Sequence, residues 1–159
     1  MYYFINDITG YRLNVVDAAC GSRFYNFEKT KDGGTTWTEV NADPFDQNMG
    51  VAEGLLFFTN DFGFAGLTYA SEDFSMLYVT KDGGETFERL ELPLDTVTEL
   101  PSEAAELGFT IEDYDYHTMP QIVDGKMEIY LQTDAMEQQG IIFQSEDNGV
   151  TWEYAGCKG

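Results

Sequence analysis

Short stretches of alternating apolar and polar residues recur along the chain, and they predict β-strands. Glycine, asparagine and aspartate separate neighbouring stretches, which is typical of antiparallel hairpins, and Asp124-Gly125 is a strong two-residue hairpin signal. The sequence therefore predicts an all-β protein with three groups of four strands. The expected strands are 2–7, 11–17, 23–29 and 36–40 in the first group, 54–59, 63–69, 76–80 and 86–92 in the second, and 120–123, 126–132, 140–144 and 151–154 in the third.

One eight-residue pattern recurs near the end of each group: a hydroxyl residue, any residue, Asp, any residue, Gly, any residue, Thr and an aromatic residue. A repeat of this kind indicates that the chain is built from similar structural units. The residues that form the three copies are Thr30, Asp32, Gly34, Thr36 and Trp37, then Thr80, Asp82, Gly84, Thr86 and Phe87, and finally Ser145, Asp147, Gly149, Thr151 and Trp152.

The chemistry of this pattern predicts a self-closed turn between two strands. Glycine supplies a backbone angle that other residues resist, and the aspartate carboxylate can accept hydrogen bonds from the backbone a few residues later. The aromatic residue that follows is expected to wedge against a neighbouring sheet. We therefore interpret the three aspartates as structural residues bonded to their own turns, and not as calcium ligands.

These turns resemble the Asp-box of the bacterial neuraminidase repeat (BNR) family, which includes sialidases, sortilin-type receptors and photosystem assembly factors. The Thr-Lys-Asp-Gly-Gly of the first two copies is similar to the non-sialidase branch, and Phe87 in place of Trp is a mild departure. The resemblance implies a β-propeller fold. It implies little about activity, because in that family the box lies away from the active face.

The resemblance and the spacing together predict a single propeller-type domain over 1–159 with three four-stranded antiparallel blades. The blades are expected at about 1–42, 51–93 and 118–156, with an inserted connection at about 94–117 that contains a short helix over 101–108. Propellers close with four to eight blades, and an open array leaves apolar faces bare. We therefore expect a homodimer that completes a six-bladed ring, and the alternative is a fragment of a larger propeller protein.

The composition of the chain limits the classes of partner that it can bind. The formal net charge of −21 should repel nucleic acid and anionic membrane surfaces, so neither is an expected partner. The start of the chain has no signal-peptide pattern, so the protein is expected to be cytoplasmic if the chain is complete, and extracellular or at the cell surface if it is a mature fragment. Cys20 and Cys157 are expected to be free thiols, with an intersubunit disulfide as the alternative.

Sialidase activity is not expected. Sialidases hold the substrate carboxylate with three arginines, one of them in a Phe-Arg-Ile-Pro-like motif, because guanidinium groups match carboxylates. This chain lacks the motif, and its arginines are Arg12, Arg23 and Arg89. No motif for a cofactor is present, so we predict no catalytic residues and no cofactor.

One local cluster, Glu112-Asp113-Tyr114-Asp115-Tyr116-His117, could bind a ligand. In an extended strand, Asp113, Asp115 and His117 would share one face and the two tyrosines the other. The polar face could hold a divalent metal or perform acid–base chemistry, and the tyrosines could stack on a sugar. The preferred interpretation is a strand that enters the third blade, with packed tyrosines and solvated acids.

The sequence thus predicts a non-catalytic recognition or scaffold module. It would bind a protein or a glycan through the connections 41–51 and 93–119. The alternative is a carboxylate-based glycoside hydrolase, which would need two acids in one pocket, about 5 to 9.5 Å apart.

Overall fold

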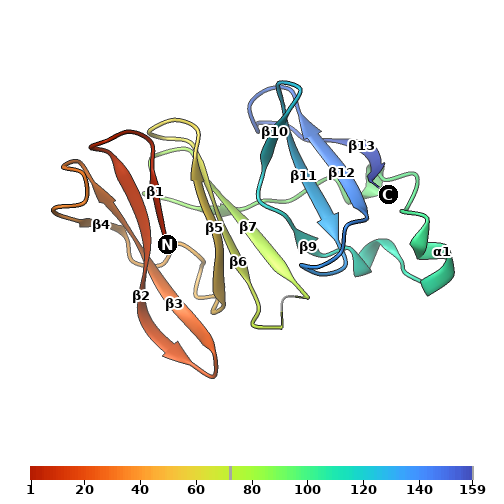
Figure 1. Cartoon of the computed structure of the whole chain (residues 1–159), viewed down its shortest axis with the longest axis horizontal. Helices are drawn as coiled ribbons and strands as arrows, with labels where there is room; N and C mark the ends of the chain where they lie inside the picture. The colour runs from red at the N-terminus through yellow and green to blue at the C-terminus, as the bar shows by residue number, and fades with distance from the viewer. Residues whose placement is uncertain (72, 159) are drawn as a thin grey trace. The chain divides into compact units, whose positions relative to one another are not determined.

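A computed structural model of the chain describes residues 1–71 and 73–158. Nearly all of its regular structure is antiparallel β-sheet, in three sheets that we call A, B and C in chain order (Figure 1). The predicted all-β class and the three groups of strands are confirmed. Within the chain, contacts group into two compact units, one formed by Met1–Ala70 with Met76–Leu90 and the other by Ser71–Ser75 with Glu91–Gly159.

Sheet A has four strands in sequential order: β1 (Tyr2–Phe4), β2 (Gly10–Ala19), β3 (Ser22–Thr30) and β4 (Thr38–Asn41). The long β2–β3 hairpin turns at Cys20 and Gly21, which both have positive φ (52° and 82°). Such a pair of angles matches the right-handed twist of the strands that it joins.

Sheet B repeats this order with β5 (Val51–Phe57), β6 (Gly63–Thr68), β7 (Ser75–Thr80) and β8 (Glu88–Arg89). All six residues of β6 are buried, so it is the most buried strand of this sheet.

Sheet C contains β10 (Gln121–Val123), β11 (Lys126–Gln132), β12 (Gly140–Ser145) and β13 (Glu153–Lys158) in sequential order. A short extra strand, β9 (Tyr116–His117), pairs with the far end of β11. The predicted Asp124-Gly125 turn is confirmed, since both residues have positive φ (50° and 80°).

The last strand of every sheet begins later than the alternation predicts. Strands β4, β8 and β13 start at Thr38, Glu88 and Glu153, two residues beyond the threonine of each repeated turn. The backbone N–H of that threonine donates to the aspartate of the turn at 2.8–2.9 Å and is therefore not available to the ladder. The turn chemistry, and not the side-chain pattern, sets where the strand begins.

Sheets A and B, both in the first unit, pack through aromatic rings. Phe57 stacks on Tyr11 with 3.7 Å between ring centroids, and Phe87 meets Phe27 edge-on at 5.1 Å. A Cβ atom added to Gly84 would lie 1.9 Å from Cε1 of Phe27, so the second turn itself presses against sheet A. Phe87 therefore wedges against the neighbouring sheet, as predicted.

The connection between sheets B and C holds η1 (Leu94–Thr96), α1 (Glu103–Leu107) and η2 (Ile111–Asp113). The predicted helix is confirmed, and it ends at Gly108 in the left-handed region (φ 74°). Ser102 precedes the helix at the N-cap position, where a serine is expected to cap it, but its side chain makes no capping hydrogen bond. Its hydroxyl instead lies 3.5 Å from Oε1 of Gln139.

Candidate functional site

The three repeated turns share one hydrogen-bond arrangement. In the first, the Thr30 hydroxyl donates to Oδ1 of Asp32 at 2.8 Å and accepts from the N–H of Gly34 at 2.9 Å. The same carboxylate accepts from the N–H and the hydroxyl of Thr36, at 2.8 and 2.6 Å. The same four bonds recur around Asp82 and Asp147. Each turn is therefore closed by its own side chains.

These bonds keep the aspartates ionised. Hydrogen bonds from Thr36, and then from Thr30, lower the pKa of Asp32 to about 2, and those from Thr151 and Ser145 lower that of Asp147 to about 2. At Asp82, burial opposes the shift, but the hydrogen bonds from its threonines still lower the pKa. A carboxyl group with a low pKa is a poor general acid at neutral pH. The turn aspartates are thus structural groups.

We predict that these turns make the fold acid-sensitive. Since the folded-state pKa lies below the unfolded value of about 3.9, the stabilisation is present above pH 4 and is lost as the pH falls towards 2. Asp147→Asn should lower the melting temperature at pH 7, and its difference from wild type should vanish near pH 2. Asp124→Asn removes the same charge from a hairpin turn and is the control. A pH-independent difference for Asp147→Asn would contradict this account.

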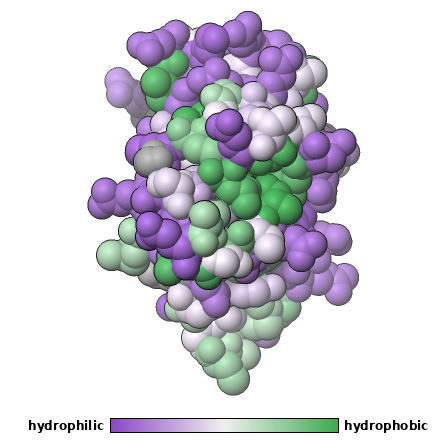
Figure 2. Space-filling view, turned by 90° about the vertical axis from the view of Figure 1, so that its right-hand side faces the viewer, coloured by the Kyte–Doolittle hydropathy of each residue, from purple (hydrophilic) through white to green (hydrophobic). Residues whose placement is uncertain are grey.

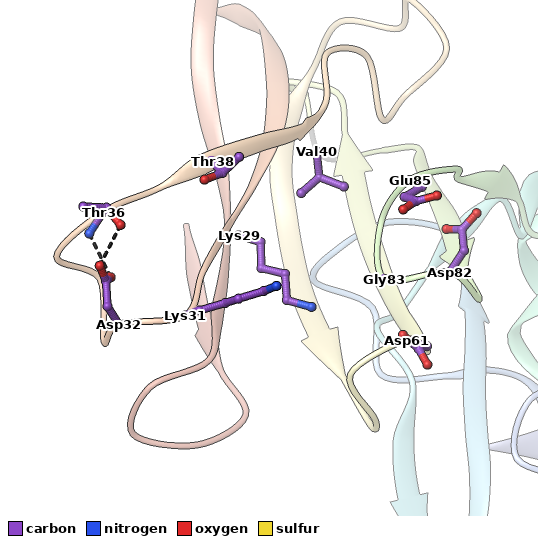
Figure 3. A pocket seen from close by; sticks show the side chains of 10 residues that line it. All are labelled: Lys29, Lys31, Asp32, Thr36, Thr38, Val40, Asp61, Asp82, Gly83 and Glu85. Carbon is purple, nitrogen blue, oxygen red and sulfur yellow. Dashed lines mark hydrogen bonds between the residues drawn. The ribbon is translucent and has the colours of Figure 1, made fainter.

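A pocket of about 550 Å³ opens between β3 and β4 of sheet A and two turns of sheet B (Figure 3). We call it the lysine pocket. The side chains of Lys29 and Lys31 extend from sheet A into this space, and Asp61, Asp82 and Glu85 lie on the opposite side (Figure 3). The remaining lining residues are Asp32, Thr36, Thr38, Val40 and Gly83.

Both lysines come from the junction of β3 with the first turn. Lys29 lies near the end of β3 and Lys31 is the first residue beyond it, and both side chains point into the pocket (Figure 3). The ammonium group of Lys29 lies 5.3 Å from the ring centroid of buried Tyr11, which provides a cation–π contact. Among the described residues, neither lysine has an ion-pair partner within salt-bridge distance. Two like charges therefore face one polar cavity, where they can donate hydrogen bonds to a ligand.

Sheet C has a corresponding hollow of about 430 Å³ beside its own turn. Counting from the hydroxyl residue of each turn, Gln144 and Glu146 occupy the positions of the two pocket lysines. Glu146 forms an ion pair with Lys126 at 2.5 Å. A hollow beside the turn therefore recurs in sheets A and C. Of these two hollows, the one beside sheet A contains two lysines without ion-pair partners in the part of the chain that the structure describes.

The stretch 112–117 is not the single extended strand that the metal hypothesis requires. Ile111–Asp113 is a 3₁₀ helix, and only Tyr116–His117 is extended. The carboxylate of Asp113 caps this helix by accepting from the N–H (2.7 Å) and hydroxyl (3.1 Å) of Thr110. The three suggested ligands therefore do not share one strand face, and no group of acids, histidine or cysteines within residues 1–71 and 73–158 is arranged to hold a metal ion.

The two tyrosines of this stretch are buried, so they present no stacking surface for a sugar. The Tyr114 hydroxyl donates to Oε1 of Glu103 at 3.2 Å, and burial raises the pKa of this tyrosine. Tyr116 belongs to β9, followed by His117, whose Nδ1 lies 3.2 Å from the carbonyl oxygen of Asp115. The packed tyrosines agree with the preferred interpretation of a strand entering the sheet.

The connection carries an apolar surface of its own (Figure 2). Leu94, Val97, Leu100, Phe109 and Ile111 line an open groove of about 480 Å³ there. This gathering lies within the 93–119 connection that the sequence singled out for recognition.

The cysteines Cys20 and Cys157 are free thiols in this chain. The Cys157 thiol donates to the carbonyl oxygen of Glu99 at 3.2 Å. The intersubunit disulfide stays untested, because it would need a second chain.

The sequence interpretation missed Lys29 and Lys31. A signal was present, since two of the eight basic residues of a chain with net charge −21 stand two apart, one at the end of the predicted strand 23–29 and one in the turn that follows. Within the described part of the chain, no helix is long and apolar enough to cross a membrane. No family model matches this chain, and a search of curated proteins finds no similar sequence.

Proposed function

We propose that this chain is a non-catalytic recognition module whose sheets are blades of the propeller type, and that the lysine pocket binds a glycan. The pocket combines ammonium donors with the carboxylate acceptors Asp61 and Glu85. A sugar hydroxyl both donates and accepts, so it matches such a mixed lining. The observation that carries the proposal is the pair of unpaired lysines converging on a polar cavity.

Catalysis is the competing function, and the two turn aspartates of the pocket are unsuited to it. A glycoside hydrolase needs one carboxylic acid whose pKa is raised, so that it can protonate the leaving group. Asp32 and Asp82, which line this pocket, have lowered pKa values because their threonines bond to the ionised form. We therefore favour binding without turnover.

The proposal predicts a specific loss of binding. The wild-type chain is expected to bind members of a glycan array, and Lys29→Gln with Lys31→Gln should weaken a confirmed hit at least about 10-fold, since hydrogen bonds to charged groups contribute about 1.5–3 kcal/mol each. Isothermal titration calorimetry would measure the change. Lys126→Gln, which alters the corresponding hollow of sheet C, is the control and should stay within about 2-fold of wild type.

A blank array, or a hit that binds the double variant as well as wild type, would contradict the assignment of this pocket. The homodimeric ring is a separate prediction of the sequence, and the oligomeric state in solution tests it.

A further inference from the structure

Sheet A has one face packed against sheet B and another that points away from it. The register places Tyr2, Arg12, Glu28 and Glu39 in one row across all four strands on the second face. We call this surface the Trp37 face. Its members are Tyr2, Phe4, Arg12, Asn26, Glu28, Trp37 and Glu39.

The repeat shows what this face corresponds to in sheet B. Phe4 pairs with Gly10 as Phe57 pairs with Gly63, and Trp37 follows its turn as Phe87 does. In sheet B these aromatic residues form the contact with sheet A. In sheet A the same positions are uncovered in the chain, and Tyr2 and Phe4 are 62% and 43% exposed.

The centre of the Trp37 face is not suited to a second sheet of the same kind. The first residue of each repeated turn carries a hydroxyl group and gives a common reference point. Two and four residues before it, sheet B has buried Tyr78 and Met76, and sheet C has buried Phe143 and Ile141. Sheet A instead has Glu28 and Asn26 at these two positions. A partner must therefore satisfy polar groups as well as cover aromatic rings.

The aromatic part of the face has the composition of a recognition surface. Trp37 lies 5.7 Å from the ring of Tyr2 and 6.0 Å from that of Phe4. The guanidinium of Arg12 lies over the Trp37 ring, 4.5 Å from its centroid, and pairs with Glu28. Trp, Tyr and Arg are the residues that contribute most at protein interfaces.

The polar part of the face contains one buried acceptor that receives no hydrogen bond. Asn26 is 5% exposed, and its Nδ2 donates to Glu39 at 2.7 Å and to Glu28 at 3.4 Å. The amide orientation is fixed by these two carboxylates, and it leaves the buried Oδ1 without a partner. A buried acceptor that is not satisfied costs free energy, so a donor from outside would be stabilised there.

We propose that the Trp37 face docks a basic segment of a partner protein. Its cationic side chains would donate to Asn26, Glu28 and Glu39, and their aliphatic stems would cover Trp37 and Tyr2. The homodimeric ring expected from the sequence would instead bring a second copy to this face. Charge favours the basic segment over that copy, because a chain of net charge −21 attracts cationic partners and repels another chain of the same charge.

Tryptophan fluorescence can test the site directly. Trp152→Phe leaves Trp37 as the only tryptophan, and the second turn already carries phenylalanine at the corresponding position. Hexa-arginine amide should then change the Trp37 emission in a saturable way, and hexa-glutamate should not. An unchanged emission with hexa-arginine would overturn the proposal.

A charge-matched pair separates docking from general attraction. Glu39→Gln should weaken hexa-arginine binding about 5-fold, whereas Glu88→Gln, the same change on the last strand of sheet B, should weaken it less than about 2-fold. Equal losses would mean diffuse attraction only and would refute the site. Light scattering adds a second arm: a dimer that dissociates on Trp37→Ala would make a second copy the occupant and overturn the proposal.

Discussion

Gly84→Ala is expected to destabilise the first unit by about 2–5 kcal/mol, from about 1–2 kcal/mol of left-handed backbone strain and about 1–3 kcal/mol of overpacking. Gly84 has a φ of 95°, and a Cβ atom there would lie 1.9 Å from Cε1 and 2.5 Å from Cδ1 of Phe27. Phe27 is fully buried against Tyr11 and Phe57, so its ring has little room to move. Urea unfolding measures the change.

Gly34→Ala is the matched control for this substitution. Gly34 occupies the same position of the first turn and has nearly the same φ, 89°. A Cβ atom there would lie 3.5 Å from the nearest atoms of Phe4 and Trp37, which is ordinary contact. Gly34→Ala should therefore cost only the strain, about 1–2 kcal/mol. Equal losses for the two variants would show that the turn of sheet B does not press on sheet A.

Phe57→Ala should cost about 3–5 kcal/mol, because it removes a large ring from a packed core and leaves a cavity. Phe57 is 1% exposed and stacks on Tyr11 at 3.7 Å. It also lies 5.8 Å from the ring of Phe27, so one side chain joins the two sheets. Chemical denaturation of the purified variant gives the free energy of unfolding.

The repeat again offers a control, since Phe4 holds the corresponding position in sheet A. Phe4 is 43% exposed, so Phe4→Ala should cost only about 1 kcal/mol. A loss as large as that of Phe57→Ala would mean that the Trp37 face is covered in the isolated chain.

The three self-closed turns followed from the sequence alone. Every bond that closes a turn joins residues at most four positions apart, such as Asp147 to Thr151 or Ser145 to Gly149. Interactions of such short range depend on residue type and spacing, so a single chain determines them. The alternating strands and their sequential pairing were predictable for the same reason, because hairpins join neighbours in the chain.

The prediction of an extended strand over 112–117 was wrong because local pattern allows two structures there. Asp113 can either lie on one face of a strand or cap a 3₁₀ helix, and the alternation of polar and apolar residues is compatible with both. Its bond to Thr110, together with the burial of Tyr114, decides for the helix. The sequence offered the residues for both structures.

Only the tertiary structure decided which polar residues face a cavity and which faces are covered. Lys29 and Asp61 line one pocket although they are far apart in the chain, because sheets A and B pack together. The equivalent residues Phe4 and Phe57 differ only in whether another sheet lies against them. Local pattern specifies each hairpin, but burial depends on the neighbour that a sheet meets, and that neighbour is chosen by packing over the whole unit.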